Sequence, residues 1–241
     1  MRLTAYAQRN FKELMRDPLS LVFGVGLPVV LLLLISMLQR SIFVEHFQID
    51  QFAPGMAMFS FSFISLFSSM LLANDRASSF LTRLFASPLT AGDYLAGYSL
   101  PLLPIALIQS LACFVVAFFF GLPVNANVLL SIVALLPIAV FFIGLGLLLG
   151  CLLGSKQVGA ISSIVVQVAA LSSGMWFDLS MIGGVFRTVC YALPFAHAVD
   201  AARMALSGQY AGILPHILWC VGYAVAVFAA AVLVFRKKMK E

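Results

Sequence analysis

The chain has 241 residues and a formal net charge of +5. Apolar residues make up 63% of it and charged residues only 10%, whereas soluble domains contain roughly 45–50% apolar and about 25% charged residues. A soluble protein of this size has too little interior to hide so much apolar surface, so the composition excludes soluble, disordered, collagen-like and disulfide-scaffold proteins. The four cysteines lie in apolar stretches without metal-site spacing, and we expect them to be buried thiols.

Long uncharged stretches divide the chain into membrane spans, because a helix needs about 20 mostly apolar residues to cross the hydrocarbon core. They lie between Asp17 and Arg40, Asp50 and Asp75, Asp93 and Lys156, Lys156 and Asp178, and Arg203 and Arg236. A turn cluster at 121–127 divides the longest stretch into two. The pattern predicts one all-α integral membrane domain, 1–241, with six transmembrane helices at about 19–38, 54–73, 98–120, 128–153, 157–177 and 215–235.

The distribution of Lys and Arg predicts the orientation of these spans. Eleven of the 14 basic residues fall on one side of the six-span arrangement, together with both termini, and only Arg40, Arg187 and Arg203 fall on the other. Both termini are therefore expected in the cytoplasm.

The N-terminal segment 1–17 has the pattern of an amphipathic helix. Leu3, Ala7, Phe11, Leu14 and Met15 share one helical face, and Arg2, Arg9, Lys12 and Arg16 share the other. Such a helix is expected in the membrane interface, with its basic face toward anionic headgroups. The alternative is an ordinary positively charged anchor that happens to be helical.

A second short amphipathic helix is predicted at 75–87, between spans two and three, where Pro88 would end it. Its apolar patch comprises Phe80, Leu81, Leu84 and Phe85, opposite the charged Arg76 and Arg83. A solvated helix would not display two Phe and two Leu without a partner, so lipid or another protein is expected to cover the patch.

Small and hydroxylated residues mark two of the predicted spans. Ser62, Ser65 and Ser69 share a face of span two, either for helix packing or to line a translocation path. In span four, Gly146, Gly150 and Gly154 recur every four residues, a spacing that lets two helix backbones approach closely, here within one chain.

The outer segment 178–214 is too apolar for a simple loop, yet its apolar pieces, 181–192 and 196–206, are too short to span. Pieces of this length read as re-entrant or interfacial helices. In the second piece, Asp200 and Arg203 can pair on one face. His197 lies one turn earlier, where a structural hydrogen-bonding role is favoured over a metal or catalytic one.

The sequence shows no energy source of its own. It contains no phosphate-binding loop, zinc-protease or serine-hydrolase motif, and Gly150–Lys156 has the wrong spacing for the first of these. No Asp, Glu, Lys, Arg or His lies near the middle of a predicted span, although ion-coupled transporters usually carry such a residue there. If the protein transports a solute uphill, another subunit must supply the energy.

Three segments together resemble the membrane (permease) subunit of type-2 ABC exporters, over essentially the whole chain. They are Arg16-Asp-Pro18 with Gly24, Gly26 and Pro28; Asn74-Asp-Arg76 with Leu81-Thr-Arg-Leu-Phe-Ala-Ser-Pro-Leu89; and Leu193-Pro-Phe-Ala-His197 with Asp200-Ala-Ala-Arg203 and Gly208. The middle segment is similar to the signature that the family carries between spans two and three. One departure is that the family often has a Glu near Arg76, whereas here the acid is Asp75, on its other side.

The resemblance implies a role for each of these segments. The N-terminal helix would be the connecting helix, and 178–210 would form re-entrant helices, with His197, Asp200 and Arg203, that cap the path. The helix at 75–87 would be the coupling helix docked on an ATPase, through Arg76, Phe80, Leu81, Arg83, Leu84 and Phe85. Spans two and five would face a partner permease, with Phe59, Ser62, Ser65, Ser163 and Gln167 lining the path.

The resemblance thus implies a non-enzymatic permease of an ATP-driven exporter in a bacterial-type cytoplasmic membrane. It would pair with a second copy or a paralogue and bind two cytoplasmic ABC ATPases, which hold ATP and Mg. The chain itself is expected to bind membrane lipids but no cofactor and no nucleic acid. The alternatives are a non-transporting assembly or scaffold factor and a facilitative channel, neither of which needs a bound ATPase.

Overall fold

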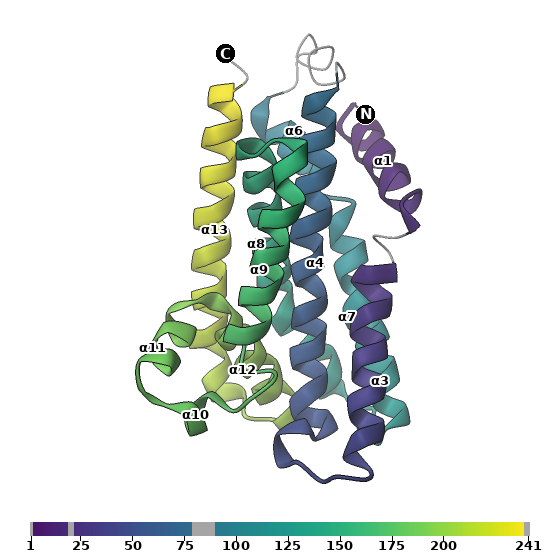
Figure 1. The fold of residues 1–241 in the computed structure, drawn as a ribbon, viewed down its shortest axis with the longest axis vertical. Helices are drawn as coiled ribbons and strands as arrows, with labels where there is room; N and C mark the ends of the chain where they lie inside the picture. The colour runs from purple at the N-terminus through teal and green to yellow at the C-terminus, as the bar shows by residue number, and fades with distance from the viewer. Residues whose placement is uncertain (1, 19–21, 79–89, 239–241) are drawn as a thin grey trace.

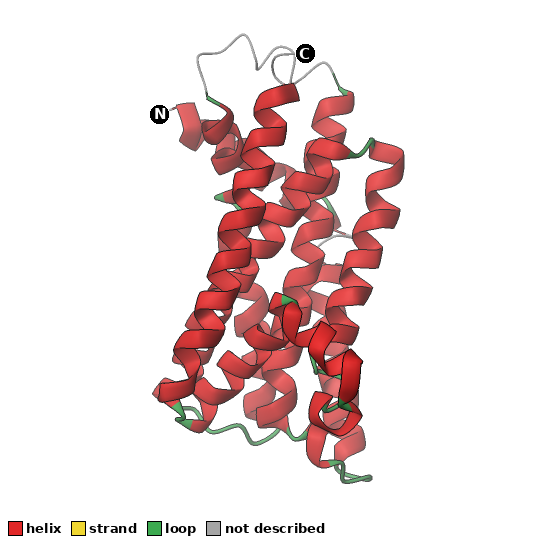
Figure 2. Cartoon of the chain, turned by 90° about the vertical axis from the view of Figure 1, so that its left-hand side faces the viewer, coloured by secondary structure: helices red, strands yellow, loops and turns green. Residues whose placement is uncertain are grey.

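A computed structural model describes residues 2–18, 22–78 and 90–238, and within these ranges the chain is all-helical, without a strand (Figures 1 and 2). The elements are α1 (Arg2–Met15), η1 (Val22–Gly26), α3 (Leu27–Gln39), η2 (Glu45–Phe47), α4 (Ile49–Ala77), α6 (Ala91–Ser99), α7 (Leu102–Phe119), α8 (Ala126–Leu152), α9 (Ser155–Ser172), α10 (Leu179–Ile182), α11 (Gly184–Ala192), α12 (Pro194–Ser207), η3 (Tyr210–Gly212) and α13 (Ile213–Lys238).

Five helical segments are long and apolar enough to cross a membrane, so the structure is that of an integral membrane protein. These segments are Val22–Gln39, Ile49–Ala77, Gly92–Phe119, Ala126–Leu152 and Tyr210–Lys237, and each overlaps one predicted span. The predicted span at 157–177 corresponds to α9, which is not among the five. Its 18 residues include the polar Lys156, Gln157 and Gln167, which lower its apolar character.

The second span is longer than its apolar run. The sequence predicts a helix at 54–73, but α4 extends from Ile49 to Ala77 and includes Asp75 and Arg76 in its last turn. The predicted separate helix at 75–87 is therefore wrong at its start, because residues 75–77 continue α4. The rest of that prediction, from 79 onward, lies outside the described residues.

The helix α4 is the centre of the bundle. It contacts α3 and α7 on one side and α8 and α9 on the other, while α13 packs on α8 (Figure 1). Most of its membrane-crossing length is buried by these neighbours. Both ends of the described chain lie at one end of the bundle, and α10, α11 and α12 lie at the opposite end (Figure 1).

The helices α4 and α8 approach each other closely through residues without bulky side chains. A Cβ atom added to Gly146 would collide with the Ser68 side chain and the Ser65 backbone, and one added to Gly150 would lie 2.8 Å from the Ser69 carbonyl oxygen. The serine hydroxyls donate back to their own helix, as Ser65 does to the Ser62 carbonyl at 2.6 Å, so they need no partner across the interface. The third glycine of the predicted stripe, Gly154, has open space around it at the N-cap of α9.

We expect Gly146→Ala to destabilise the protein, because the new methyl group can be accommodated only if α4 and α8 move apart. Overpacking of this kind costs about 1–3 kcal/mol. Thermal unfolding of the detergent-solubilised protein should show a lower Tm than wild type. The control is Gly222→Ala on α13, where a Cβ meets nothing within 4 Å and the Tm should not fall. Equal Tm values for the two variants would contradict the close approach.

Candidate functional site

The segment that carries the predicted docking patch connects two well-formed helix ends. Phe80, Leu81, Arg83, Leu84 and Phe85 all fall in 79–89, outside the described residues. Before this segment, α4 ends at Ala77. After it, α6 begins with a capping box, in which the Thr90 backbone N–H donates to Asp93 Oδ2 at 2.8 Å and Thr90 Oγ1 accepts from the Asp93 N–H at 3.3 Å.

Asp75, in the last turn of α4, is the centre of a buried polar cluster. Its side chain is almost inaccessible, and Arg9 of α1 donates to it twice, from Nη1 to Oδ2 at 2.6 Å and from Nη2 to Oδ1 at 2.9 Å. Tyr98 of α6 donates its hydroxyl to Oδ2 at 2.7 Å. A bidentate Arg–carboxylate pair with a further donor is among the stronger side-chain arrangements. Asp75 therefore links three helices at one end of the bundle.

The helix α1 packs on α6 through a face that includes polar residues. Tyr6 lies edge-on to Tyr94 and Tyr98, with ring centroids 6.0 and 5.4 Å apart, and Asn10 Nδ2 donates to the Gly97 carbonyl at 3.0 Å. A Cβ on Gly97 would collide with the Tyr6 ring, so this packing requires glycine.

The structure corrects the predicted orientation of Arg9. The sequence places Arg9 with Arg2, Lys12 and Arg16 toward lipid headgroups, but its guanidinium is held by Asp75. Helical periodicity sorts residues by polarity and cannot reveal a carboxylate 66 positions away. Burial lowers the pKa of Arg9, but the hydrogen bonds and charge of Asp75 outweigh this effect and raise the pKa. From the predicted apolar face, Leu14 is buried, whereas Phe11 and Met15 remain exposed.

Arg76, next to Asp75, binds the end of α8. Its Nη1 donates to carbonyl oxygens at the end of α8, those of Gly150 at 2.6 Å, Cys151 at 2.5 Å and Leu153 at 3.3 Å. The last carbonyls of a helix lack partners within the helix and carry partial negative charge, so a guanidinium is a favourable cap. Adjacent residues at the end of α4 thus fasten it to α1, α6 and α8, directly before 79–89. A contact of Arg76 with an ATPase stays a prediction.

The predicted path residues fall into two groups. Phe59, Ser62 and Ser65 of α4 are buried within this chain, and the Ser62 hydroxyl donates to the Phe59 carbonyl at 2.6 Å. Ser163 and Gln167 lie on the exposed face of α9. The structure therefore does not bring the five residues together on one accessible surface of the single chain.

The predicted outer residues lie in a hydrogen-bonded cluster. His197 Nε2 lies 2.9 Å from the Tyr191 carbonyl, which can only accept, so Nε2 carries the proton. The Nδ1 atoms of His197 and His216 lie 2.8 Å apart, so one of the two rings donates a hydrogen bond to the other. Asp200 accepts from the Tyr191 hydroxyl at 2.8 Å, and burial, together with the Asp200 charge, raises the pKa of Tyr191 to about 12.

Arg203 fastens α12 to the rest of the bundle. Its Nη1 lies 3.9 Å from Asp200 Oδ1, which is the pairing that the sequence predicts. Its stronger contacts are unforeseen: Nε donates to the Gln51 carbonyl at 2.9 Å and Nη2 to the Gly174 carbonyl at 3.1 Å. Burial lowers the pKa of Arg203. The ranges that the structure describes contain no group of three or more His, Cys, Asp or Glu side chains able to hold a metal ion.

We expect Asp75→Asn and Arg9→Met to lower the Tm strongly and by similar amounts, with little further loss in the double variant. Removing one partner of a buried ion pair costs about 3–5 kcal/mol, and the partial exposure of Arg9 favours the lower end of that range. The matched control is Glu13→Gln, which removes the exposed pair of Arg9 with Glu13, 3.0 Å apart, and should cost about 1 kcal/mol or less. Additive losses in the double variant would show that Arg9 and Asp75 are not coupled.

A comparison with curated proteins found no match. A family model does match: that of the ABC-2 type transporter, over residues 1–207. The match extends from α1 through the end of α12 and includes Asp75 and Arg76 as well as His197, Asp200 and Arg203. Since it covers well over half of the sequence, the chain belongs to the ABC-2 type transporter family, as its membrane domain.

Proposed function

We propose that this chain is one of two permease subunits of an ATP-driven exporter and that residues 79–89 dock on a cytoplasmic ATPase. As an ABC-2 membrane domain, it is a transmembrane component without an ATPase domain of its own, and it partners ABC ATPase subunits. Beyond family membership, we propose that the complex exports its substrate, that it contains two permease copies and two ATPases, and that residues 79–89 form the docking segment. The observation that supports it is the junction of Asp75 and Arg76, which joins the last turn of α4 to α1, α6 and α8 just before residues 79–89.

The proposed topology has six spans, with α9 as the fifth. Its 18 residues give a length of about 27 Å, close to the roughly 30 Å of a hydrocarbon core. It runs beside α4 and α8 in the bundle (Figure 1). With six spans, both termini and residues 79–89 lie on the same side of the membrane. Lys and Arg are in excess on that side, so it would be the cytoplasmic side of a bacterial-type membrane. The helices α10, α11 and α12 then form the outer, re-entrant segment.

The junction offers a route for force from the ATPase into the membrane. ATP-driven closure of the ATPases would move the patch of Phe80, Leu81, Leu84 and Phe85. Residues 79–89 follow α4 directly, so this motion would reach Asp75 and Arg76 first. Asp75 would pass it to α1 and α6, and Arg76 to α8, so that several helices tilt together.

The exposed face of α9 is the proposed contact with the second permease copy and the wall of the path. Lys156, Ser163 and Gln167 lie within one narrow stripe at 100° per residue, and all three are exposed. Polar side chains are unfavourable against lipid tails, so this stripe is better accommodated by another subunit or by water. Ser62 and Ser65 would reach such a path only if α4 and α8 separate.

We expect a Leu84→Asp, Phe85→Asp double variant to lose the co-expressed ATPase on affinity purification, because two charges cannot replace an apolar contact. Membrane insertion and Tm should match wild type. The control, Met181→Asp, places a charge on an exposed apolar residue of α10 at the other end of the bundle and should retain the ATPase. Wild-type ATPase yield from the double variant would contradict docking through this patch.

We also expect Ser163→Cys to form a disulfide-linked dimer in membranes treated with a mild oxidant, because α9 would face its copy across a two-fold axis. The native Cys113, Cys151, Cys190 and Cys220 are buried, so background cross-linking should be low. Leu218→Cys, exposed on α13, is the matched control and should stay monomeric. Cross-linking through Leu218→Cys but not through Ser163→Cys would place the dimer contact on α13 instead.

A further inference from the structure

Two of the three histidines in the chain face each other at the end of the bundle opposite the termini. His197, in α12, and His216, in α13, have Nδ1 atoms 2.8 Å apart and ring centroids 4.9 Å apart. The third histidine, His46, lies in η2, with its Nε2 3.1 Å from the Met175 carbonyl oxygen. Neither the family match nor the proposed coupling mechanism assigns the pair of His197 and His216 a role.

The contact between the two rings depends on how many protons they hold. When both rings are neutral, one Nδ1 atom donates and the other accepts. When one ring is protonated, this imidazolium donates to the neutral ring, and such a charge-assisted hydrogen bond is stronger than a neutral one. When both rings are protonated, both Nδ1 atoms carry hydrogens and both rings are cationic, so the hydrogen bond is lost and the rings repel each other. The contact therefore withstands the first added proton and breaks with the second.

His197 connects three helices through its two ring nitrogens. Its Nδ1 faces His216 in α13, and its Nε2 donates to the Tyr191 carbonyl at the end of α11, 2.9 Å away. Because Nε2 keeps its hydrogen when the ring is protonated, acid leaves the contact with α11 in place. Acid removes only the contact between α12 and α13.

Two further hydrogen bonds attach this region to α13. The Tyr223 hydroxyl donates to the Ala192 carbonyl at 2.6 Å, and Cys220 Sγ donates to the Pro194 carbonyl at 3.4 Å. A phenol and a thiol keep their hydrogens in acid, whereas histidine is the side chain that ordinarily titrates between about pH 5 and 8. The contact between the two imidazoles is therefore the acid-sensitive one of these three.

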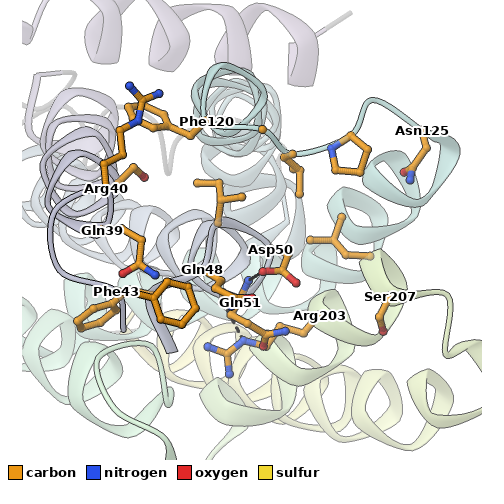
Figure 3. A pocket seen from close by; sticks show the side chains of 17 residues that line it. Gln39, Arg40, Phe43, Gln48, Asp50, Gln51, Phe120, Asn125, Arg203 and Ser207 are labelled. Atoms are coloured by element: carbon orange, nitrogen blue, oxygen red, sulfur yellow. Dashed lines mark hydrogen bonds between the residues drawn. The ribbon is translucent and has the colours of Figure 1, made fainter. Parts of the chain in front are cut away.

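The charged groups around the pair come from α11 and α12. Asp200, one turn further along α12, accepts from the Tyr191 hydroxyl at 2.8 Å and lies 3.9 Å from Arg203 Nη1. The Nε of Arg203 points to the start of α4, where it donates to the Gln51 carbonyl beside the pocket drawn in Figure 3. Arg187 of α11 lies over the Tyr191 ring, 5.6 Å from its centroid. The helix α8, which packs on α12 and α13, carries no Asp, Glu, Lys, Arg, His or Tyr.

The pair is accessible to protons from water. Both rings are partly exposed, and each is the fourth residue of its helix. In the proposed six-span orientation, this end of the bundle faces the outside of the cell. The side on which the pair lies rests on that proposed function, whereas the dependence of the contact on protons does not.

We infer that His197 and His216 form a proton-binding pair that controls how α11 and α12 attach to α13. Uptake of the second proton opens the contact between α12 and α13, and the hairpin of α10 and α11 gains freedom relative to α13. The helix α12 stays fastened to α4 through Arg203. Acid outside the cell would thus loosen this end of the protein without unfolding the bundle.

The experiment measures the distance between spin labels at Met181→Cys in α10 and Leu218→Cys in α13, by pulsed electron–electron resonance on the full-length protein in detergent. Both positions are exposed, and the four native cysteines are buried. Dilution with unlabelled protein restricts the signal to distances within one chain. With both histidines present, the distance distribution should be narrow at about pH 8 and broader at about pH 4.5, above and below the range in which histidine ordinarily titrates.

The matched variant is His216→Gln. A glutamine amide can accept from His197 Nδ1 or donate to it, so the contact survives in both protonation states and the distribution should stay narrow in acid. Asp200 is unchanged in this variant, so any effect of protonating carboxylates is common to both proteins. His46→Gln, which removes the histidine outside the pair, should retain the broadening.

Nitrogen NMR of the same protein with isotope-labelled histidine counts the protons on each ring. Both His197 and His216 should be imidazolium at about pH 4.5. Equal broadening in His216→Gln and in the protein with both histidines would overturn the proposal. So would an unchanged distribution once both rings are protonated, or a pair that does not take up its second proton between about pH 8 and 4.5. The measurement in detergent is independent of orientation and of the ATPase, so failure of the proposed exporter function would leave its result unchanged.

Discussion

The last turn of α4 carries the interaction on which the rest of the arrangement depends. Asp75 and Arg76 are consecutive, yet one binds Arg9 and Tyr98 and the other binds the end of α8. A carboxylate as buried as that of Asp75 is stable only when it is paired and hydrogen-bonded. The two residues therefore fix the positions of α1, α6 and α8 relative to α4, at the end of the bundle where both termini lie.

A second constraint lies inside the bundle, where lipid tails provide no hydrophobic driving force for helices to associate. Close approach must then come from small residues. Gly146 and Gly150 supply it on α8, and the serine face of α4 supplies it on the other side. The close packing of α4 against α8 and the hydrogen bonds at the end of α4 both couple the two helices. A displacement at the end of α4 would move α8 with it, rather than being absorbed between the two helices.

Composition and charge spacing predict much of this fold. A membrane-crossing helix must be long enough and apolar enough, and the positions of the charged residues in the sequence show which stretches meet both requirements. The five long apolar segments follow from these requirements alone. The helix α9 meets them less clearly, since Lys156 and Gln167 lower its apolar character. The spacing of Gly146 and Gly150 predicts close packing but does not identify α4 as the neighbour.

The candidate site is less accessible to such reasoning. Arg9 and Asp75 are 66 positions apart, and Arg76 reaches carbonyls about as far away, so only the three-dimensional arrangement reveals these contacts. A carboxylate near the end of an apolar span predicts that a cationic or hydrogen-bonding partner lies nearby, but it does not identify that residue. The pairing of Asp200 with Arg203 was predictable because it lies within one helical turn, whereas the contacts of Arg203 with Gln51 and Gly174 were not.

We propose above all that the Asp75–Arg76 junction transmits ATPase motion to the opposite end of the bundle, where α10 lies. The most direct test is pulsed electron–electron resonance on the reconstituted complex with spin labels at Met181→Cys of both permease copies, compared with and without ATP. We predict an ATP-dependent change in the label distance that Asp75→Asn abolishes while the ATPase stays bound and active. A full ATP-dependent change in the Asp75→Asn complex would contradict the account.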